Sequence, residues 1–331
     1  MNVLFIGLGY MGLERLKIFR KLKKKFKINN FFFYDPFYKN KDKKLIKLNK
    51  LTPQIIADYN IDICVISTPH FLIKKYSILC LRSKRKVCLI IEKPYGRNLK
   101  ESKEISKHLK KNQRIFIGLN YRFFQGISRM LKDIKHKKFG KIYSIDINFG
   151  HGHNPAIKKT WKLDKKLAGG GAILDPGIHV LNLIQLITKF DVKLINVYKK
   201  CNFWDTGVED NALIILSSKK IPLITIKLST TMWRSTFQIQ GNGSKGYWRI
   251  NGRGRSYGPQ TYVTGKRWGW LKGKKQKSTE QIHSDSNEKD VFLRETVEIL
   301  QSIKKGGNKK RVCDDKEAIK TMMLLKKIYA F

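Results

Sequence analysis

The feature that most constrains the fold is a glycine motif at the start of the chain. An apolar run over residues 2–6 leads directly into a turn that contains Gly7, Gly9 and Gly12, and a helical pattern follows. Glycines at this spacing allow a tight strand-to-helix turn, close approach of the backbone to a pyrophosphate and close helix–strand packing. The N–H groups and positive dipole end of the helix attract phosphate. The segment therefore predicts the first unit of a dinucleotide-binding fold.

An acidic residue follows at the spacing that such a fold uses. The apolar run at residues 31–34 ends at Asp35, about 20 residues after the glycine motif. A carboxylate there accepts hydrogen bonds from the adenosine ribose and repels the extra phosphate of NADP. We therefore predict NAD rather than NADP as cofactor. The alternative is an ordinary glycine turn followed by a surface aspartate.

The length and the rhythm of the chain indicate two domains. The chain has 331 residues, of which 41% are hydrophobic, and this length favours about two domains. Strand-like runs alternate with amphipathic stretches up to residue 118, and residues 45–59 are expected to form one of the helices. After residue 122 the runs alternate as antiparallel strands do.

The fold class is predicted as α/β, with an N-terminal Rossmann doubly wound parallel sheet and a C-terminal α+β domain that has a large, mostly antiparallel open sheet. The predicted ranges are 1–121 for the NAD-binding domain, 122–313 for the substrate and oligomerisation domain, and 314–331 for a C-terminal helix that packs back on the body.

The cellular location of the protein can be predicted from its apolar segments and its cysteines. Residues 3–13 resemble the core of a signal peptide, but no basic segment precedes them and no small-residue cleavage site follows. Elsewhere the apolar runs are of strand length, well short of the ~18 residues that a membrane span needs. The five cysteines are scattered without a C-x-x-C motif, which fits a reducing compartment. We expect a soluble, cytoplasmic protein.

The net charge of +44 raises the alternative of a nucleic-acid-binding protein. The basic runs are spread over the whole chain, and lysine greatly outnumbers arginine. A dedicated binder concentrates charge on one face, with arginines and aromatic residues placed to contact bases. We therefore expect only nonspecific binding of polyanions, at low salt.

Two segments carry candidate catalytic groups. An apolar run at residues 87–91 delivers Glu92, Lys93 and Pro94 to the carboxyl end of a predicted sheet strand, where ligands bind in open α/β sheets. A lysine beside the nicotinamide can hydrogen-bond the reacting hydroxyl or carbonyl group and help to move its proton. The alternative is a surface lysine in a lysine-rich chain.

The second segment contains Asp175 and His179, after a triple glycine at residues 169–171. The two residues are four apart in a predicted helix that runs to about Ile187, so both should face the same side. Imidazole accepts protons near neutral pH, and a carboxylate can orient it. The triple glycine would allow close approach of the backbone to substrate or nicotinamide. The alternative is a capping aspartate and a packed histidine.

A metal site is a further alternative. His151 and His153 could join Asp175 and His179 as four nitrogen and oxygen ligands. Because no sequence rule brings the two pairs together, we predict no metal and expect His153 and Asn154 to contact substrate.

On these motifs the chain resembles the glucose–fructose oxidoreductase / inositol dehydrogenase / rhizopine-catabolism (Gfo/Idh/MocA) family over nearly its whole length. The matching segments are Gly7 to Gly12, Asp35-Pro36, Ser67-Thr68-Pro69, Glu92-Lys93-Pro94, Tyr121-Arg122-Phe123, Gly169 to His179, Glu209-Asp210 and Gly246 to Gly258. The resemblance implies a Rossmann domain followed by an open-sheet domain, and hydride transfer at a sugar or polyol carbon. It also implies a catalytic group of Lys93, Asp175 and His179.

The chain departs from the family pattern at His70 and Ile73, at Gln125, and at Asn182, where an acidic residue often follows the catalytic histidine. The predicted cofactor-binding residues are Gly7, Gly9, Tyr10, Met11, Gly12, Asp35, Ser67, Thr68, Pro69, His70, Glu92 and Lys93. The predicted substrate-binding residues are Arg122, His153, Asn154, Trp161, Lys162 and His179.

The predicted function is an NAD-dependent oxidoreductase that acts on a small-molecule sugar. Arg122 and Lys162 suggest an anionic substrate, because arginine suits phosphate and carboxylate. This indicates a nucleotide-linked or phosphorylated sugar of surface polysaccharide synthesis. The alternatives are a free inositol or polyol dehydrogenase and a non-catalytic Rossmann-fold binding protein. We also expect a homo-oligomer.

Overall fold

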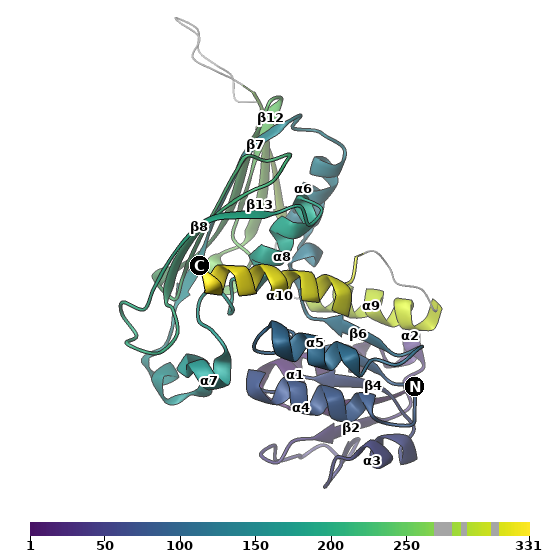
Figure 1. Cartoon of the computed structure of the whole chain (residues 1–331). Coiled ribbons are helices and arrows are strands. Elements are labelled where there is room, and N and C mark those ends of the chain that lie inside the picture. The colour runs from purple at the N-terminus through teal and green to yellow at the C-terminus, as the bar shows by residue number, and fades with distance from the viewer. Residues whose placement is uncertain (268–279, 286–289, 306–310) are drawn as a thin grey trace, which may run out of the picture. The chain divides into compact units, whose positions relative to one another are not determined.

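The computed structural model describes residues 1–267, 280–285, 290–305 and 311–331, and the chain forms two compact units (Figure 1). Unit 1 comprises Met1–Asn120, Lys166–Gly169 and Phe292–Met323. Unit 2 comprises Tyr121–Lys165, Gly170–Val291 and Leu324–Phe331. Within the described ranges, no helix is both long and apolar enough to cross a membrane.

Unit 1 is built on a six-stranded parallel sheet, which confirms the predicted Rossmann fold. The strand order is β3-β2-β1-β4-β5-β6. The order reverses between β1 and β4, and ligands bind at such a point, beyond the carboxyl ends of the strands. The strands are β1 (Asn2–Ile6), β2 (Phe31–Tyr34), β3 (Leu45–Lys47), β4 (Ile61–Ile66), β5 (Cys88–Ile91) and β6 (Arg114–Ile117).

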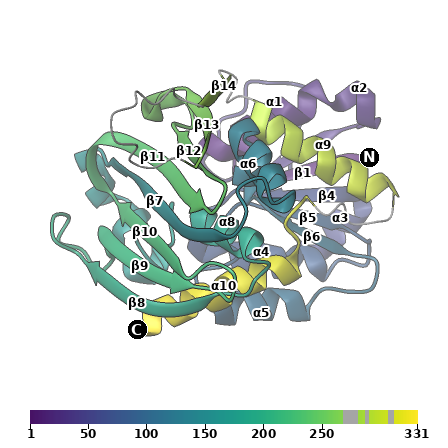
Figure 2. The ribbon, with the colours of Figure 1, turned by 90° about the horizontal axis from the view of Figure 1, so that it is seen from above.

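Helices cover this sheet, and α1 and α9 lie side by side (Figure 2). Val3, Leu4, Phe5 and Ile6 of β1 are fully buried, as expected for a parallel strand with both faces covered. The helices of this unit are α1 (Tyr10–Lys21), α2 (Lys23–Phe26), α3 (Pro53–Asp58), α4 (His70–Leu81), α5 (Leu99–Lys107), α9 (Asp290–Lys305) and the first part of α10 (Asp315–Ala330).

The units differ from the predicted domain ranges near the C-terminus. The sequence places residues 292–313 in the second domain, but in the structure the described residues among them, 292–305 and 311–313, belong to unit 1. The Ile117 amide donates to the Cys313 carbonyl at 2.9 Å, and Phe116 forms an isolated antiparallel bridge with Asp314. Helix α10 passes from unit 1 to unit 2 after Met323. The return of the chain to unit 1 cannot be predicted from local sequence, because the return depends on pairing between segments that are distant in sequence.

Residues 45–59 also differ from the prediction of one helix. They form β3 and, after an interruption, α3. Pro53 occupies the first position of α3, and the Thr52 hydroxyl accepts from the Ile55 amide at 3.1 Å. Proline is favourable at the start of a helix and disruptive inside one, so a new helix begins here.

Unit 2 is built on an eight-stranded, mostly antiparallel sheet, which confirms the predicted second sheet. The order is β14-β13-β12-β11-β7-β10-β9-β8, with β7 and β10 parallel and the other pairs antiparallel. The strands are β7 (Ile142–Gly152), β8 (Lys193–Lys200), β9 (Asn211–Ser217), β10 (Leu223–Ser229), β11 (Thr231–Gly243), β12 (Gly246–Asn251), β13 (Gln260–Lys266) and β14 (Gln281–Asp285).

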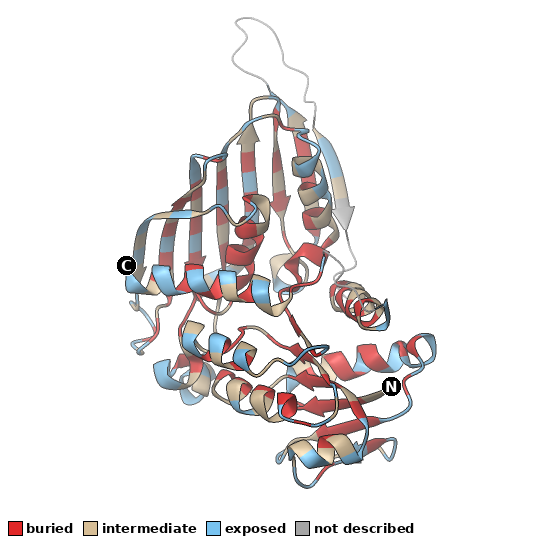
Figure 3. Cartoon of the chain, turned by 45° about the vertical axis from the view of Figure 1, so that its right-hand side comes forward, coloured by how far each residue is buried: buried red, intermediate tan, exposed pale blue. Residues whose placement is uncertain are grey.

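Helices cover one face of this sheet, and burial alternates along its strands (Figure 3). In β7, Ile145, Ile147 and Phe149 are buried, whereas Asp146 is exposed. This alternation is expected when one face of an antiparallel sheet packs on a core. The helices are α6 (Gln125–Lys135), α8 (Ile178–Ile187) and short 3₁₀ segments η1 (Asn120–Phe123), η2 (Pro155–Lys159), η3 (Trp161–Leu163) and η4 (Arg255–Tyr257); α7 (Lys165–Ala168) is shared with unit 1.

Candidate active site

The glycine turn between β1 and α1 has the shape that a dinucleotide requires. Gly7 has φ +87°, and a Cβ there would lie 2.8 Å from the Ser67 carbonyl oxygen. A Cβ on Gly12 would lie 2.1 Å from the Gly7 carbonyl oxygen. By contrast, a Cβ on Gly9 would meet nothing within 4 Å. Gly7 and Gly12 therefore serve internal packing, while the backbone at Gly9 is open to a ligand.

The start of α1 fits a pyrophosphate. The helix begins at Tyr10, so its first amides include those of the predicted contacts Tyr10 and Met11. Its first turn carries no acidic side chain, and Gly9 at the N-cap has none to offer the amides. A helix start in this form presents its N–H groups and positive dipole end to anions.

Asp35 lies beside the same turn. Its Oδ2 accepts from the Leu8 amide at 2.7 Å. Its Oδ1 accepts from the amides of Phe37 and Tyr38 at 2.8 and 3.1 Å. These three bonds fix the carboxylate next to the glycine motif, at the carboxyl end of β2. This is the position that a group contacting the adenosine ribose would occupy.

We expect NAD to bind at least tenfold more tightly than NADP, a difference of about 1.4 kcal/mol. The charge of Asp35 would repel a 2′-phosphate, and Asp35→Asn should narrow the gap because it removes the charge but keeps an acceptor. Titration of both nucleotides into the wild type and the variant measures this. The exposed Asp58→Asn is the matched control. Equal affinities in the wild type would remove Asp35 from this role.

The end of β4 offers two hydroxyl groups to a ligand. The side-chain oxygens of Ser67 and Thr68 are buried and have no protein hydrogen-bond partner within the described residues. Pro69 is the N-cap of α4. His70 begins α4, and its Nδ1 donates to the Ala168 carbonyl at 2.8 Å. The two hydroxyls therefore fit a ligand role, whereas Nδ1 of His70 is committed within unit 1.

Glu92 and Lys93 leave the sheet at the end of β5, which pairs with β4. The Glu92 amide donates to the Ile66 carbonyl at 2.9 Å. Its carboxylate accepts from Nε of Arg15, in α1, at 2.6 Å. Because Glu92 is held by its backbone and its side chain, it fixes the position from which Lys93 extends. The Glu92 carboxylate thus helps to hold Lys93 in place.

Arg15 joins Glu92 to a second carboxylate. It is fully buried, and its Nη2 lies 2.7 Å from Oε2 of Glu295 in α9. Its guanidinium also lies 5.0 Å from the centroid of the Phe292 ring. Burial alone would lower the pKa of Arg15, but Glu295 and Glu92 together raise it above its ordinary value. Sequence reasoning missed this network because Glu295 is distant in sequence.

The segment around Asp175 and His179 differs from the predicted single helix. Helix α8 begins at Ile178, with Gly177 as its N-cap, so the prediction that Asp175 lies on this helix is wrong. The residue before a proline is disfavoured in the helical conformation, and Pro176 follows Asp175. Asp175 therefore lies in the preceding turn, whereas His179 lies in the first turn of α8.

The imidazole of His179 is held against an aromatic ring. His179 is buried, and its ring stacks on that of Tyr121 with centroids 4.1 Å apart and planes 7° apart. Tyr121 belongs to the segment Tyr121-Arg122-Phe123 that carried part of the family resemblance. Stacking of this kind fixes the plane of the imidazole.

Glu209 supports the glycine-rich turn that leads to these residues. Its Oε1 accepts from the amides of Gly171 and Ile173 at 3.0 and 2.9 Å and from the Tyr329 hydroxyl at 2.8 Å. A Cβ on Gly171 would lie 1.9 Å from the Glu209 carbonyl oxygen, and one on Gly170 would lie 2.0 Å from the Tyr329 hydroxyl. These two glycines therefore serve close packing within unit 2.

His151 and His153 lie next to each other, and Asp175 is near enough to affect the pKa of both. Their ring centroids are 4.9 Å apart. Burial, then His153, lowers the pKa of His151 to about 4, with Asp175 acting in the opposite direction. Burial also lowers the pKa of His153, again opposed by Asp175. Both imidazoles are thus neutral at pH 7. In the described part of the chain, no three His, Cys, Asp or Glu residues are grouped so that they could hold a metal ion.

The other predicted substrate contacts have varied surroundings. Arg122 is 4% exposed, and its Nη2 donates to Oδ1 of Asn182 at 2.6 Å. Oδ1 of Asn154 accepts from the Ala156 amide at 2.9 Å and caps η2. Trp161 and Lys162 lie in η3, where Lys162 is exposed. Of the two predicted cations, Lys162 is thus the one that the solvent reaches.

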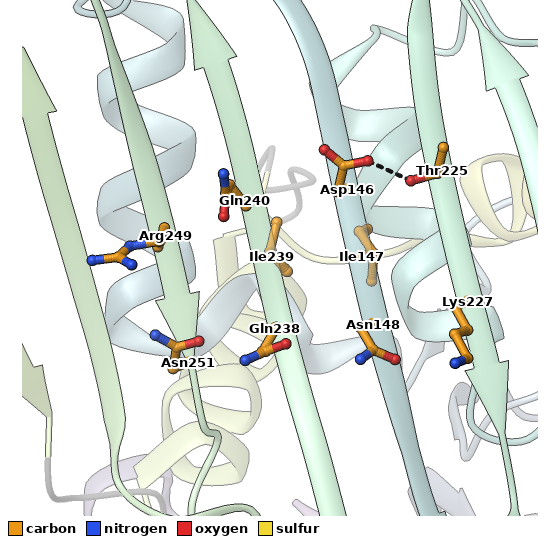
Figure 4. A pocket seen from close by; sticks show the side chains of 10 residues that line it. All are labelled: Asp146, Ile147, Asn148, Thr225, Lys227, Gln238, Ile239, Gln240, Arg249 and Asn251. Atoms are coloured by element: carbon orange, nitrogen blue, oxygen red, sulfur yellow. Dashed lines mark hydrogen bonds between the residues drawn. The ribbon is translucent and has the colours of Figure 1, made fainter. Parts of the chain in front are cut away.

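The open face of the unit 2 sheet has a groove of about 440 Å³ (Figure 4). Because side chains alternate along a strand, Asp146 and Asn148 of β7 point away from the face that holds Phe149 and His151. The groove is therefore on the opposite face of the sheet from His151. Its lining residues are Asp146, Ile147, Asn148, Thr225, Lys227, Gln238, Ile239, Gln240, Arg249 and Asn251.

A Rossmann sheet with an open glycine turn, joined to a unit with a large antiparallel sheet, defines a class of two-domain dinucleotide-binding oxidoreductases. Residues 1–120 match the family described as "Oxidoreductase family, NAD-binding Rossmann fold", and residues 127–249 match the "GFO/IDH/MocA C-terminal domain". The chain belongs to the GFO/IDH/MocA oxidoreductase family.

Curated relatives and solved structures agree with this assignment. A levoglucosan dehydrogenase of Pseudarthrobacter phenanthrenivorans is 28% identical over 40% of this chain and 34% of its own length. A 1,5-anhydro-D-fructose reductase of Ensifer adhaerens is 22% identical over 57% of each chain. The matches thus span little more than half of these relatives at most. A solved levoglucosan dehydrogenase, complexed with NADH and L-sorbose, shares the fold, with a TM-score of 0.84 at 15% identity over 100% of this chain and 96% of that one.

Proposed function

We propose that this protein transfers a hydride between NAD and a carbon of a sugar. The observation that carries the proposal is the arrangement at the carboxyl edge of the unit 1 sheet. There Gly9 leaves the backbone open and the hydroxyls of Ser67 and Thr68 lie buried without protein partners. Lys93 leaves the neighbouring strand at the same edge. These features support a cofactor site at this edge, with Lys93 as the proton-handling side chain of the same unit.

NAD supplies the hydride acceptor when it is bound. In the oxidative direction, the carbon loses a hydride and its hydroxyl group loses a proton, which leaves a carbonyl group. We assign the proton to the His179 imidazole, with Lys93 donating a hydrogen bond to the oxygen as it becomes a carbonyl. Asp175 would support the charged imidazole. Stacking on Tyr121 holds His179 in one orientation for this step.

The relatives support a sugar as the substrate class, since their names include levoglucosan dehydrogenase and D-xylose 1-dehydrogenase (NADP(+)). Within that class we propose a nucleotide-linked or phosphorylated sugar, as used in surface polysaccharide synthesis. The exposed Lys162 supports an anionic group, because it lies close enough to His151 and His153 to affect their protonation. A free polyol such as inositol is the alternative.

The experiment is a screen for NAD reduction, followed at 340 nm, with nucleotide sugars, sugar phosphates, free inositol and free glucose. We expect a charged sugar to be turned over best. Robust turnover of a neutral polyol, unaffected by Lys162→Ala, would favour the alternative. Binding of NAD without turnover of any sugar would favour a binding protein.

We also propose a homo-oligomer in a reducing compartment such as the cytoplasm. All five cysteines lie in described ranges and are free thiols, which fits such a compartment. Light scattering of the purified protein tests the oligomer.

The net charge of +44 supports nonspecific polyanion binding at low salt, which should fall as salt is raised.

A further inference from the structure

We propose that Arg253 forms an anion-binding subsite of the sugar site, so that the substrate carries a carboxylate or phosphate group held by this guanidinium. The inference rests on the proposed function and deepens it, because it names the residue and the chemical group that decide the substrate class. The residues on which it depends all lie within unit 2.

The backbone around Arg253 is fixed by glycines. Arg253 lies in the turn between β12 and β13, between Gly252 at φ +72° and Gly254 at φ +89°. A Cβ on Gly252 would lie 2.2 Å from the Pro259 carbonyl oxygen. Both positions thus have the left-handed conformation that glycine adopts at no steric cost, and Gly252 also has no room for a side chain. The turn therefore presents Arg253 in a defined place.

Aromatic rings surround the guanidinium. Its central carbon lies 4.0 Å from the centroid of the Tyr257 ring and 5.7 Å from the centroids of Tyr121 and Phe149. Stacking uses the flat face of a guanidinium, while its N–H donors lie in the plane. Contact with these rings therefore restricts the orientation of the guanidinium, as a site for a planar or tetrahedral oxyanion requires.

The same rings connect Arg253 to the candidate catalytic group. The Tyr121 ring, which lies against Arg253, stacks on His179. The Tyr257 hydroxyl lies 2.8 Å from Nδ1 of His151, and His151 in turn lies near Asp175. A sugar positioned at His179 would thus be bordered by the wall that carries Arg253.

The local charge favours an anion. Arg253 and Lys162 both lie close enough to His151 to lower its pKa, whereas Asp175 raises it. The imidazoles of His151 and His153 are neutral near pH 7 and add no positive charge of their own. An anionic group on the substrate would be attracted to the two cations, whereas a neutral sugar would not. Arginine binds carboxylate or phosphate through two parallel hydrogen bonds, which are stronger than neutral ones.

The test compares ligands that differ in the anionic group. Calorimetric titration of the NADH-saturated protein with glucose, glucose 6-phosphate, glucuronate, UDP-glucose and UDP-glucuronate measures binding, and NADH formation from NAD measures turnover. Salt at about 0.2 M screens the general positive charge of the chain. At least one charged sugar should bind ten or more times more tightly than glucose. Preference for glucuronate indicates a carboxylate, and preference for glucose 6-phosphate or UDP-glucose indicates a phosphate.

Variants test the residue itself. Arg253→Gln should weaken the preferred charged ligand at least tenfold and glucose less than twofold. The exposed Arg234→Gln, in the same unit, should leave both within twofold. Arg253→Lys keeps the charge but loses the paired donors, so it should fall between wild type and Arg253→Gln. Arg253→Lys also provides the test if Arg253→Gln does not fold. Unchanged affinity of Arg253→Lys for the charged ligand would then overturn the proposal that two guanidinium donors bind the anionic group.

The outcomes separate this inference from the proposed function. If no charged sugar binds better than glucose, or Arg253→Gln weakens both ligands equally, the subsite is overturned even if NAD-dependent turnover occurs. If charged sugars bind through Arg253 but no sugar reduces NAD, the subsite stands and the proposed hydride transfer fails.

Discussion

Replacing Lys93 with alanine or glutamine is expected to lower turnover of the sugar identified by the screen by about 10²- to 10⁴-fold, the range typical of positioned acid–base groups. His179→Gln should have an effect of the same order. NAD binding should stay within a few-fold of wild type, because in our proposal the glycine turn, Ser67 and Thr68 hold the cofactor. Steady-state kinetics and NAD titration measure the two effects separately.

The exposed Lys100→Ala, at the start of α5, is the matched control and should retain full turnover. Near-normal turnover in Lys93→Ala would show that the assignment of Lys93 is wrong. A large loss of NAD affinity in the same variant would instead place Lys93 in the cofactor site alone.

Arg15→Met is expected to destabilise the protein by about 3–5 kcal/mol, because removing one partner of a buried ion pair leaves uncompensated charge. Here the carboxylates of Glu92 and Glu295 would both remain, with side chains 11% and 3% exposed. For a unit of this size the loss corresponds to a fall in Tm on the order of 10 °C. Thermal unfolding followed by circular dichroism measures it.

Arg20→Met is the matched control, since Arg20 lies on the same helix and pairs with Asp42 at the surface, with the two side chains 40% and 36% exposed. Surface pairs contribute about 0–1 kcal/mol, so its Tm should change little. Adding Glu295→Gln to Arg15→Met should recover part of the loss, because it removes one of the two unpaired charges. Equal stability of wild type and Arg15→Met would contradict the role assigned to the network.

The tertiary structure also changed which residues bear on substrate recognition. The sequence singled out Arg122 because arginine suits phosphate and carboxylate, yet its guanidinium is buried against Asn182. Arg253 drew no attention in the sequence, and only the folded turn places it on the rings of Tyr121 and Tyr257. An arginine that lies on aromatic rings cannot be distinguished in the sequence from one that hydrogen-bonds inside the protein. The difference depends on partners that only the fold brings close.

The cofactor-binding unit could be predicted from local sequence. A strand, a glycine turn, a helix and Asp35 are local features, and their spacing alone demands close packing and an open backbone at Gly9. The sequence also predicted that Lys93 follows a sheet strand, since an apolar run ends there.

The residues that hold these groups in place could be identified only in the folded chain. Arg15 joins Glu92 to Glu295, and Glu209 bonds to the turn at Gly171. In each case the partners are far apart in the chain and meet through packing, which leaves no pattern in the local sequence. The helix that contains His179 was likewise predicted to begin too early. The spacing of Asp175 and His179 suggested that both lie on one helix face, but Pro176 excludes Asp175 from the helix.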